Sequence, residues 1–171
     1  MKQGTVIGPA GAADLDRVAE IFAHYVTHSV VTFETDPPGV ADWQARLDGL
    51  AGLGLPFLVA RADGEVAGYA YASPWRPKPA YRHTVEDTVY LAPGATGRGL
   101  GRGLLAELLA RAGQAGARQM VAVIADAGAD SEASVALHRA FGFAHAGRLT
   151  AVGHKHGRWI DTVLMQRELT T

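Results

Sequence analysis

Alternating glycines at positions 97–101 give this chain the composition of an anion-binding loop. Gly97, Gly99 and Gly101 lack Cβ atoms, so successive backbone N–H groups stay open to a ligand at the start of a helix-like segment. The helix dipole adds about half a positive charge there, and Arg98 and Arg102 are suited to bidentate contacts with phosphate oxygens. We therefore expect this loop to hold the pyrophosphate of an anionic cofactor.

Two other phosphate-binding motifs do not fit the loop. The dinucleotide fingerprint Gly-x-Gly-x-x-Gly needs glycine where the chain has Arg102 or Leu104, depending on the register. A P-loop needs Gly-Lys-Ser or Gly-Lys-Thr, and neither tripeptide occurs. One alternative stays open, in which the glycines only form a tight turn.

A carboxylate, Glu86, lies in the strand-like segment that precedes the loop. It shares a strand face with Thr88 and Tyr90, opposite a face that carries Val85 and Val89. If burial raises its pKa, the carboxylate can accept the proton of an ammonium group, directly or through water. The alternative is a solvent-facing residue or a structural ion pair.

Periodicity and turn signals predict the elements that position these residues. Strands are expected at residues 5–7, 56–61, 66–73, 84–91, 120–125, 144–152 and 159–168. Helices are expected from about residue 14, at 40–50, at 100–113, and from 131 or 134 to 141. The Asp63-Gly64 pair predicts a hairpin. A crossover from residues 84–91 through a helix to 120–125 places the glycine loop at the carboxyl edge of a sheet, where ligands bind.

Composition limits the class of protein. The chain has 171 residues, 48% hydrophobic content and a formal net charge of -1, which predicts one domain and gives no basic field for nucleic acid. No cysteine is present, and His154 and His156 have no carboxylate beside them at ligand spacing, so we expect no metal site. The sequence also shows neither a signal peptide core nor a membrane span, so we expect a cytoplasmic protein.

The order of elements and the loop together resemble the GNAT family of N-acetyltransferases. The family motif, Arg/Gln-x-x-Gly-x-Gly/Ala after a strand ending Val-x-Pro, corresponds to residues 96–101 after Leu91-Ala92-Pro93, with Thr96 at the first position. The resemblance covers nearly the whole chain. It implies a single α/β (α+β) domain over residues 1–171: a mixed, mostly antiparallel sheet of about six or seven strands, splayed at the cofactor site, with about four helices on its two faces.

The resemblance also implies acetyl-CoA as the cofactor. Backbone groups of Val89 and Leu91 would pair with pantetheine amides, and the glycine loop would hold the pyrophosphate. The implied cofactor-binding residues are Val89, Tyr90, Leu91, Thr96, Gly97, Arg98, Gly99, Leu100, Gly101, Arg102, Gly103 and Ser131, the last of which stands where many relatives have Asn.

Five separated segments are similar to the phosphinothricin and methionine sulfoximine N-acetyltransferase subgroup. They are residues 32–35, 80–82, 84–90, 134–138 and 153–159. The match implies Glu86 as a catalytic base and His138 as a catalytic acid or base, because His138 stands where many members carry a tyrosine proposed to protonate the thiolate. It also implies a homodimer.

We expect the acceptor to be selected by the cationic, aromatic loop at residues 75–82 and by residues 33–34, which follow the first helix. Arginine in this loop can bind the carboxylate or phosphinate-like oxygens of an amino acid in bidentate fashion. The expected substrate-binding residues are Phe33, Glu34, Arg76, Lys78, Tyr81, Arg82 and Lys155. For any one of them, a solvated loop position is the alternative.

The favoured hypothesis is an enzyme that acetylates the amino group of a small amino acid analogue, such as phosphinothricin or methionine sulfoximine. A second hypothesis keeps acetyl-CoA but takes another amine, such as a common amino acid, a polyamine or a protein N-terminus. A third is a CoA-binding module without turnover, which would need neither Glu86 nor His138.

Overall fold

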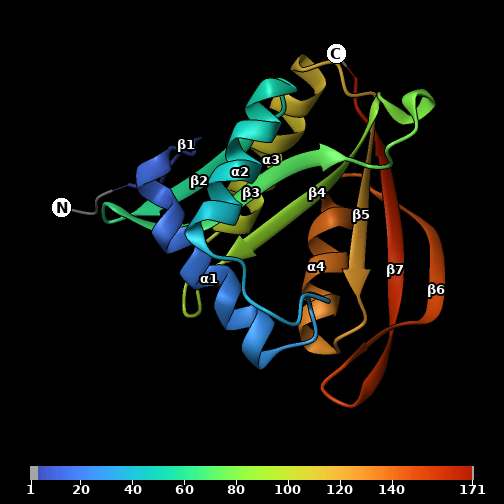
Figure 1. Ribbon diagram of the computed structural model, residues 1–171. Coiled ribbons are helices and arrows are strands. Elements are labelled where there is room, and N and C mark those ends of the chain that lie inside the picture. The colour runs from blue at the N-terminus through green and yellow to red at the C-terminus, as the bar shows by residue number, and fades with distance from the viewer. Residues whose placement is uncertain (1–3, 171) are drawn as a thin grey trace.

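The computed structural model describes residues 4–170, which form a seven-stranded sheet with helices on both faces (Figure 1). The strands are β1 (Val6–Pro9), β2 (Phe57–Ala62), β3 (Glu65–Pro74), β4 (Thr84–Leu91), β5 (Gln119–Ala125), β6 (Ala144–Lys155) and β7 (Arg158–Glu168). The helices are α1 (Leu15–His28), α2 (Val40–Gly52), α3 (Leu100–Gln114) and α4 (Ala129–Ala140), with short 3-10 turns η1 (Ala12–Asp14) and η2 (Pro79–Tyr81). The predicted mixed α/β architecture is confirmed.

The sheet is interrupted at its centre. Its strand order is β1-β2-β3-β4-β5-β7-β6, and every neighbouring pair is antiparallel except β4 and β5. These two parallel strands pair only from Thr84–Gln119 to Glu86–Val121. Beyond Glu86 they diverge, as Figure 1 shows, and leave a wedge between residues 87–91 of β4 and 122–125 of β5. The predicted crossover through α3 and the predicted splay are both present.

The helices bury the two faces of the sheet and hold the wedge open. One face of α1 is apolar at helical spacing and packs beside α2 against β3 and β4. Helix α3 packs on β2, β3 and β4, behind the sheet in Figure 1. Helix α4 packs on β5, and its Leu137 lies close to Gly101 of α3. The amino ends of α3 and α4 therefore border the wedge.

Local signals placed several turns correctly. Asp63 and Gly64 both have positive φ, 54° and 87°, as a two-residue hairpin turn between β2 and β3 requires. Gly142 has φ 81° directly after the C-cap of α4, where a left-handed residue ends the helix.

Two predicted boundaries were wrong. Helix α4 begins at Ala129, before Ser131, because Gly128 (φ 73°) turns the chain into the helix early. Strand β6 continues past residue 152 to Lys155, since a register shift between Leu149 and Gly153 absorbs extra residues without ending the strand. His156 lies beyond the strand, in a turn with φ 50°.

Candidate active site

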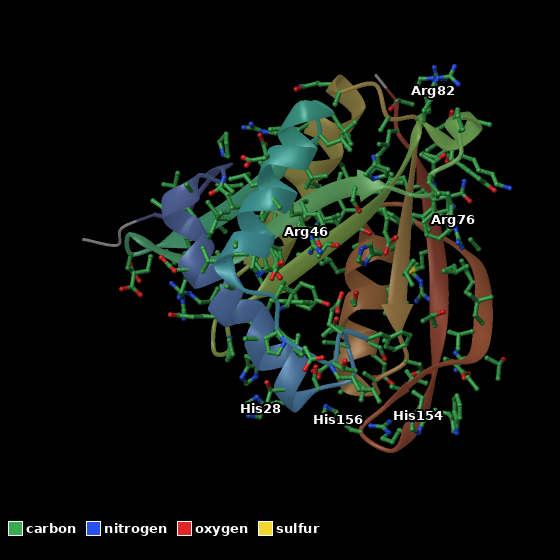
Figure 2. All side chains as sticks on the ribbon, viewed as in Figure 1. His28, Arg46, Arg76, Arg82, His154 and His156 are labelled. Carbon is green, nitrogen blue, oxygen red and sulfur yellow. The ribbon has the colours of Figure 1, made fainter. Side chains whose placement is uncertain are left out.

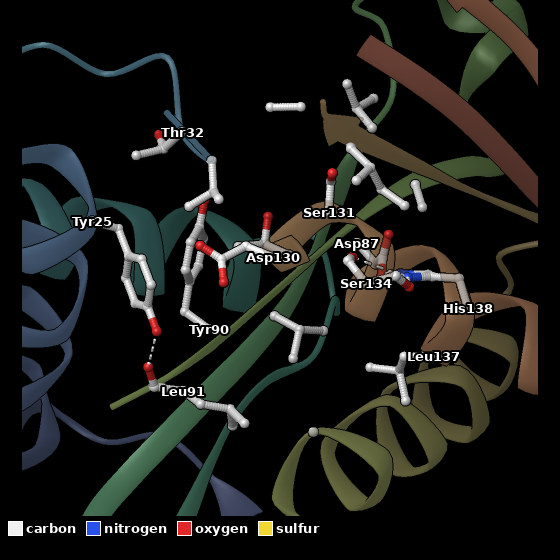
Figure 3. Close-up of a pocket in the computed structure, with 18 of the residues that line it drawn as sticks. Tyr25, Thr32, Asp87, Tyr90, Leu91, Asp130, Ser131, Ser134, Leu137 and His138 are labelled. Carbon is white, nitrogen blue, oxygen red and sulfur yellow. Dashed lines mark hydrogen bonds and ion pairs between the residues drawn. The ribbon is translucent and has the colours of Figure 1, made fainter. Parts of the chain in front are cut away.

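A cavity of about 520 Å³ occupies the wedge between β4 and β5. Its walls come from both strands, from α1 and the segment that follows it, from the start of α3 and from one face of α4 (Figure 3). Because β4 has no strand partner on this side after Glu86, its backbone edge faces the cavity. Val123 of β5, 38% exposed, also faces the cavity.

The glycine loop borders this cavity and presents unbonded amides. Within residues 4–170, no hydrogen bond uses the backbone N–H of residues 97–102; the first amide of α3 that does donate is Gly103, to Gly99 O at 3.0 Å. Gly97 and Gly99 have φ 74° and 78°, a conformation that favours glycine, and Gly99 is the N-cap of α3. Consecutive free amides at a helix N-terminus are suited to binding an anion, and the pyrophosphate-binding role of this loop stays a prediction.

The side chains of the loop are less available than its backbone. Arg98 is half-exposed, with its Nη2 3.8 Å from Asp63 Oδ2. Leu100 is buried in the core, and a Cβ on Gly103 would lie 2.7 Å from Ile7 Cδ1. The structure thus gives Leu100 and Gly103 packing roles, with any contact to a ligand left to backbone groups.

Arg102 stacks on Phe141, with its Cζ 5.1 Å from the centroid of the ring. This stacking holds the guanidinium over an aromatic face at the surface of α3. Arg102 therefore has a partner within the chain.

Half of the predicted cofactor-binding residues line the cavity itself. They are Val89, Tyr90, Leu91, Thr96, Gly101 and Ser131. The Tyr25 hydroxyl donates a hydrogen bond of 2.5 Å to the Leu91 carbonyl, which is drawn in Figure 3 and fixes the end of β4 against α1. Ser131 is buried; its Oγ accepts from Ala127 N (3.1 Å) and lies 2.7 Å from the Gly128 carbonyl, so it closes the turn that begins α4.

Glu86 lies where β4 and β5 part, and it lines the cavity. Burial raises the pKa of its carboxyl, the neighbouring Asp87 raises it further, and Arg76 partly offsets both effects. A carboxylate with a raised pKa is a stronger base than an exposed glutamate. The placement and the electrostatics both suit proton transfer from an amine in the cavity.

His138 forms a buried pair with Asp87, in the cavity wall beside α4 (Figure 3). Its Nε2 lies 2.7 Å from Asp87 Oδ2, and its Nδ1 lies 2.7 Å from the Ser134 carbonyl oxygen. A carbonyl oxygen only accepts, so Nδ1 carries a proton, and the short contact to Asp87 needs another proton on Nε2 or on the carboxyl. Burial lowers the pKa of His138, but the bonds to Asp87 and Ser134 outweigh it and the net shift is upward.

These contacts limit how His138 can act. Both ring nitrogens already have partners within the chain, so Nε2 must break its hydrogen bond to Asp87 before it can give a proton to a ligand. The predicted role of His138 as an acid or a base stays a prediction.

The predicted acceptor residues fall into two groups. Phe33 and Glu34 line the cavity, and Arg76 is close enough to Glu86 to influence its pKa. Lys78, Tyr81 and Arg82 do not line it; Figure 2 shows Arg82 beyond the top of the sheet, away from the wedge.

Lys155 is buried rather than open to a ligand. Its Nζ donates to the Thr32 carbonyl oxygen at 2.9 Å, and Lys155 is absent from the residues that line the cavity. Burial lowers the pKa of this amine, while Glu34 raises it. In the described chain Lys155 ties β6 to the segment after α1, and it therefore shapes the acceptor side of the cavity indirectly.

Sequence reasoning missed Asp87, Arg46 and Tyr25. Asp87 was a visible signal, because it is a charged residue on the otherwise apolar face of β4. Arg46 is the only arginine or lysine among the described residues that line the cavity. Its position, three residues after the buried Trp43 on α2, was the available signal, since residues at that spacing share a helix face.

Residues 4–170 contain neither a metal-ligand cluster nor a membrane-spanning helix. No group of three or more histidine, cysteine, aspartate or glutamate side chains is arranged to hold a metal ion. No helix in this part of the chain has the length and apolarity needed to cross a bilayer.

Comparisons with known proteins agree with this geometry. A family model described as the acetyltransferase (GNAT) family matches residues 15–143. A phosphinothricin N-acetyltransferase of Alcaligenes faecalis is 49% identical over 156 residues, which are 91% of this chain and 78% of that protein. An L-methionine sulfoximine/L-methionine sulfone acetyltransferase of Pseudomonas paraeruginosa is 42% identical over 164 residues, 95% of this chain and 94% of that protein.

Solved structures give the same result. The crystal structure of a GNAT superfamily phosphinothricin acetyltransferase from Sinorhizobium meliloti, in complex with AcCoA, has a TM-score of 0.91 and 46% sequence identity to this chain. The match covers 96% of this chain and 88% of that one.

Proposed function

The chain belongs to the acetyltransferase (GNAT) family, and from that premise we propose that it is an acetyl-CoA-dependent N-acetyltransferase. Its acceptor is the amino group of a small amino acid analogue such as phosphinothricin or methionine sulfoximine, the substrates for which two relatives are named. One observation carries the proposal: unbonded amides at residues 97–102 and the base Glu86 border the same wedge in the sheet.

The residues of the wedge fit acetyl-CoA. The free amides and the dipole of α3 suit a pyrophosphate. The unpaired edge of β4 after Glu86 suits the amide groups of the pantetheine arm. When bound, acetyl-CoA supplies an acetyl group activated as a thioester, which an amine attacks directly.

Glu86 prepares the amine for this attack. The carboxylate takes one proton from the ammonium form of the acceptor and so frees the lone pair of its nitrogen. A second proton leaves the nitrogen as the amide forms, and one proton ends on the departing sulfur. In this proposal His138, whose ring is held in the cavity wall by Asp87 and Ser134, is the source of the proton that the sulfur receives, and its Nε2 breaks the bond to Asp87 to give that proton up.

Glutamine at position 86 tests the role of the base. We expect Glu86→Gln to lower turnover about a hundredfold or more, because general base catalysis typically raises a rate by about that factor. Its affinity for acetyl-CoA, measured by calorimetry, stays unchanged. Glu65→Gln removes an exposed carboxylate from β3 and is the matched control.

The pH profile gives a second readout. The base acts only when ionised, and its pKa is raised, so wild-type kcat/KM falls with decreasing pH at a higher pH than an ordinary carboxyl would produce. Thiol release by Glu86→Gln at the wild-type rate would remove this role. If the wild type releases no thiol with methionine sulfoximine or with phosphinothricin, the proposed acceptor is wrong. Thiol release with other amines would then support the alternative acceptors, and no thiol release with any amine would support a CoA-binding module.

The proposal includes a homodimer in the cytoplasm, where acetyl-CoA is available. Exposed apolar side chains on β6 and β7 support an interface: Trp159 is 70% exposed, Val152 52% and Leu149 46%. Light scattering after size-exclusion chromatography measures the mass, and a monomer at micromolar concentration would contradict the dimer.

A further inference from the structure

Arg46 belongs to α2 and lines the cavity; it is labelled in Figure 2. Its Nη1 donates a hydrogen bond of 2.8 Å to the Tyr71 hydroxyl. The guanidinium also lies over two aromatic rings, with Cζ 4.8 Å from the centroid of Trp43 and 5.4 Å from that of Tyr71. The head group is therefore held in place before any ligand binds.

The charge of Arg46 has no counterpart within the chain. Among residues 4–170, none of the ion pairs involves Arg46. Tyr71 occupies one of its nitrogens, and the other N–H groups of the guanidinium remain as donors. A half-buried, oriented and unpaired guanidinium in a cavity is suited to an anionic group with two oxygens.

Arg46 and Glu86 are connected through Tyr71, which lies on the same face of the sheet as Glu86. Tyr71 pairs with Thr88 across β3 and β4, and the next residue on the same face of β4 is Glu86. Diagonal neighbours in such a ladder are about 7–8 Å apart between Cα atoms. An amine at Glu86 can therefore belong to the same small molecule as an acidic group at Arg46.

We propose that Arg46 is an anion-binding subsite of the acceptor pocket, which selects amines that carry a carboxylate or phosphinate group. The inference rests on the proposed function and deepens it by naming the residue that selects this acceptor class. Among the described residues, the other formally charged side chains that line the cavity are the acidic Glu34, Glu86, Asp87 and Asp130. Arg46 is thus the one lining arginine or lysine in this part of the chain that attracts an anionic group and repels a second ammonium group, and it is the feature that would favour an amino acid over a polyamine.

The test compares KM values of the wild type, Arg46→Met and Arg46→Lys. Methionine keeps the apolar stem over Trp43 but removes the charge, and lysine keeps the charge but not the two-pronged geometry. For methionine sulfone and phosphinothricin, we expect Arg46→Met to raise KM about tenfold to a hundredfold, as loss of a charge-assisted hydrogen bond predicts. Arg46→Lys should show a smaller rise, and the Kd for acetyl-CoA should not change.

A neutral acceptor identifies the group that Arg46 binds. If the carboxylate is bound, Arg46→Met leaves the KM for methionine sulfone carboxamide unchanged while raising it for both acids. If the phosphinate is bound, only phosphinothricin is affected. Either result supports the subsite. Arg17→Met, on the surface of α1, makes the same charge change outside the cavity and should behave as wild type.

Folding is monitored in parallel, because Arg46 packs on Trp43 and Tyr71. Tyr71→Phe keeps both rings and removes only the hydroxyl that holds Nη1, and it should raise the KM for the acids severalfold. If Arg46→Met does not fold, Arg46→Lys and Tyr71→Phe carry the test. If the wild type turns over these acids and the KM values of the folded variants lie within about twofold of the wild-type values, the subsite is wrong and the proposed function still stands. A wild type that acetylates no amine overturns the proposed function.

Discussion

The buried Asp87–His138 pair makes a pH-dependent prediction about stability. Replacing Asp87 by asparagine keeps the size of the side chain and a partner for His138, because the amide can donate to Nε2 while Nδ1 still donates to Ser134. The neutral imidazole is then fully hydrogen-bonded, but the charged imidazole has lost its counter-ion. The loss of unfolding free energy in Asp87→Asn should therefore depend on pH, which sets the fraction of charged histidine.

The sign follows from the pKa of His138 in each protein. In the wild type that pKa is raised, so the pair contributes its full stability below the unfolded pKa of about 6.5, and the contribution is lost as pH rises through the folded pKa. In Asp87→Asn both contributions of the carboxylate are gone, and burial, the largest effect, opposes only the bond to Ser134. The pKa of the imidazole then falls, so stability is lost as pH falls below the unfolded value. Both effects make the variant relatively worse in acid.

The magnitude can be bounded. In alkaline solution the exchange replaces one hydrogen bond by another, and the difference in unfolding free energy should be about 1 kcal/mol. Between about pH 8.5 and about pH 5.5 it should grow by at least about 1.4 kcal/mol, the equivalent of one pKa unit. It should approach the range of about 3–5 kcal/mol that is typical when one partner of a buried pair is removed.

Urea unfolding at several pH values, followed by circular dichroism, measures this difference. Glu20→Gln is the control, because it removes a carboxylate from the exposed pair with Arg17 and should cost less than about 1 kcal/mol with little pH dependence. A difference between wild type and Asp87→Asn that stays constant across the pH range would refute the reasoning, since it would mean that His138 is not charged in the folded protein.

Two glycine substitutions test how the site is built. Gly99→Ala places a Cβ at φ 78°, which costs about 1–2 kcal/mol. It should weaken acetyl-CoA binding, measured by calorimetry, about tenfold. Gly52→Ala in α2, where a Cβ meets open space, is the control, and equal affinities for acetyl-CoA in the two variants would count against the role of the loop. Gly153→Ala forces its Cβ into the ring of Phe33, which lines the cavity, so the KM of the acceptor should rise severalfold while the Kd of acetyl-CoA holds; an unchanged acceptor KM would show that Phe33 does not shape this pocket.

Local patterns were sufficient for much of the fold. The Asp63-Gly64 hairpin and the glycine loop each depend on backbone conformations that neighbouring residues dictate, and both were predicted from sequence. The β6 boundary failed because Ala151, with φ 51°, takes part in an irregularity that its residue type does not announce. Backbone irregularities set by tertiary pairing leave little trace in hydrophobic alternation.

The candidate site was only partly predictable, since its side chains are joined over long separations. Lys155 looked available for a substrate, yet its amine bonds to Thr32, which is 123 residues away. The partner of His138 is 51 residues away, and that of Arg46 is 25 residues away. Such contacts depend on how helices dock on the sheet, which no local spacing specifies. Glu86 was easier to identify, because it lies in the strand that leads into the glycine loop.

The short ladder between β4 and β5 has a mechanical consequence. Three residue pairs are the only strand pairing that joins β1–β4 to β5–β7–β6 in the described chain, so the two halves of the sheet can move apart more readily than any other neighbours. A molecule bound along the open edge of β4 would contact both halves of the sheet and restrict their relative movement. Backbone amides of β4 and β5 should then exchange with deuterium more slowly when acetyl-CoA is present, and the slowing should extend beyond the residues that touch it.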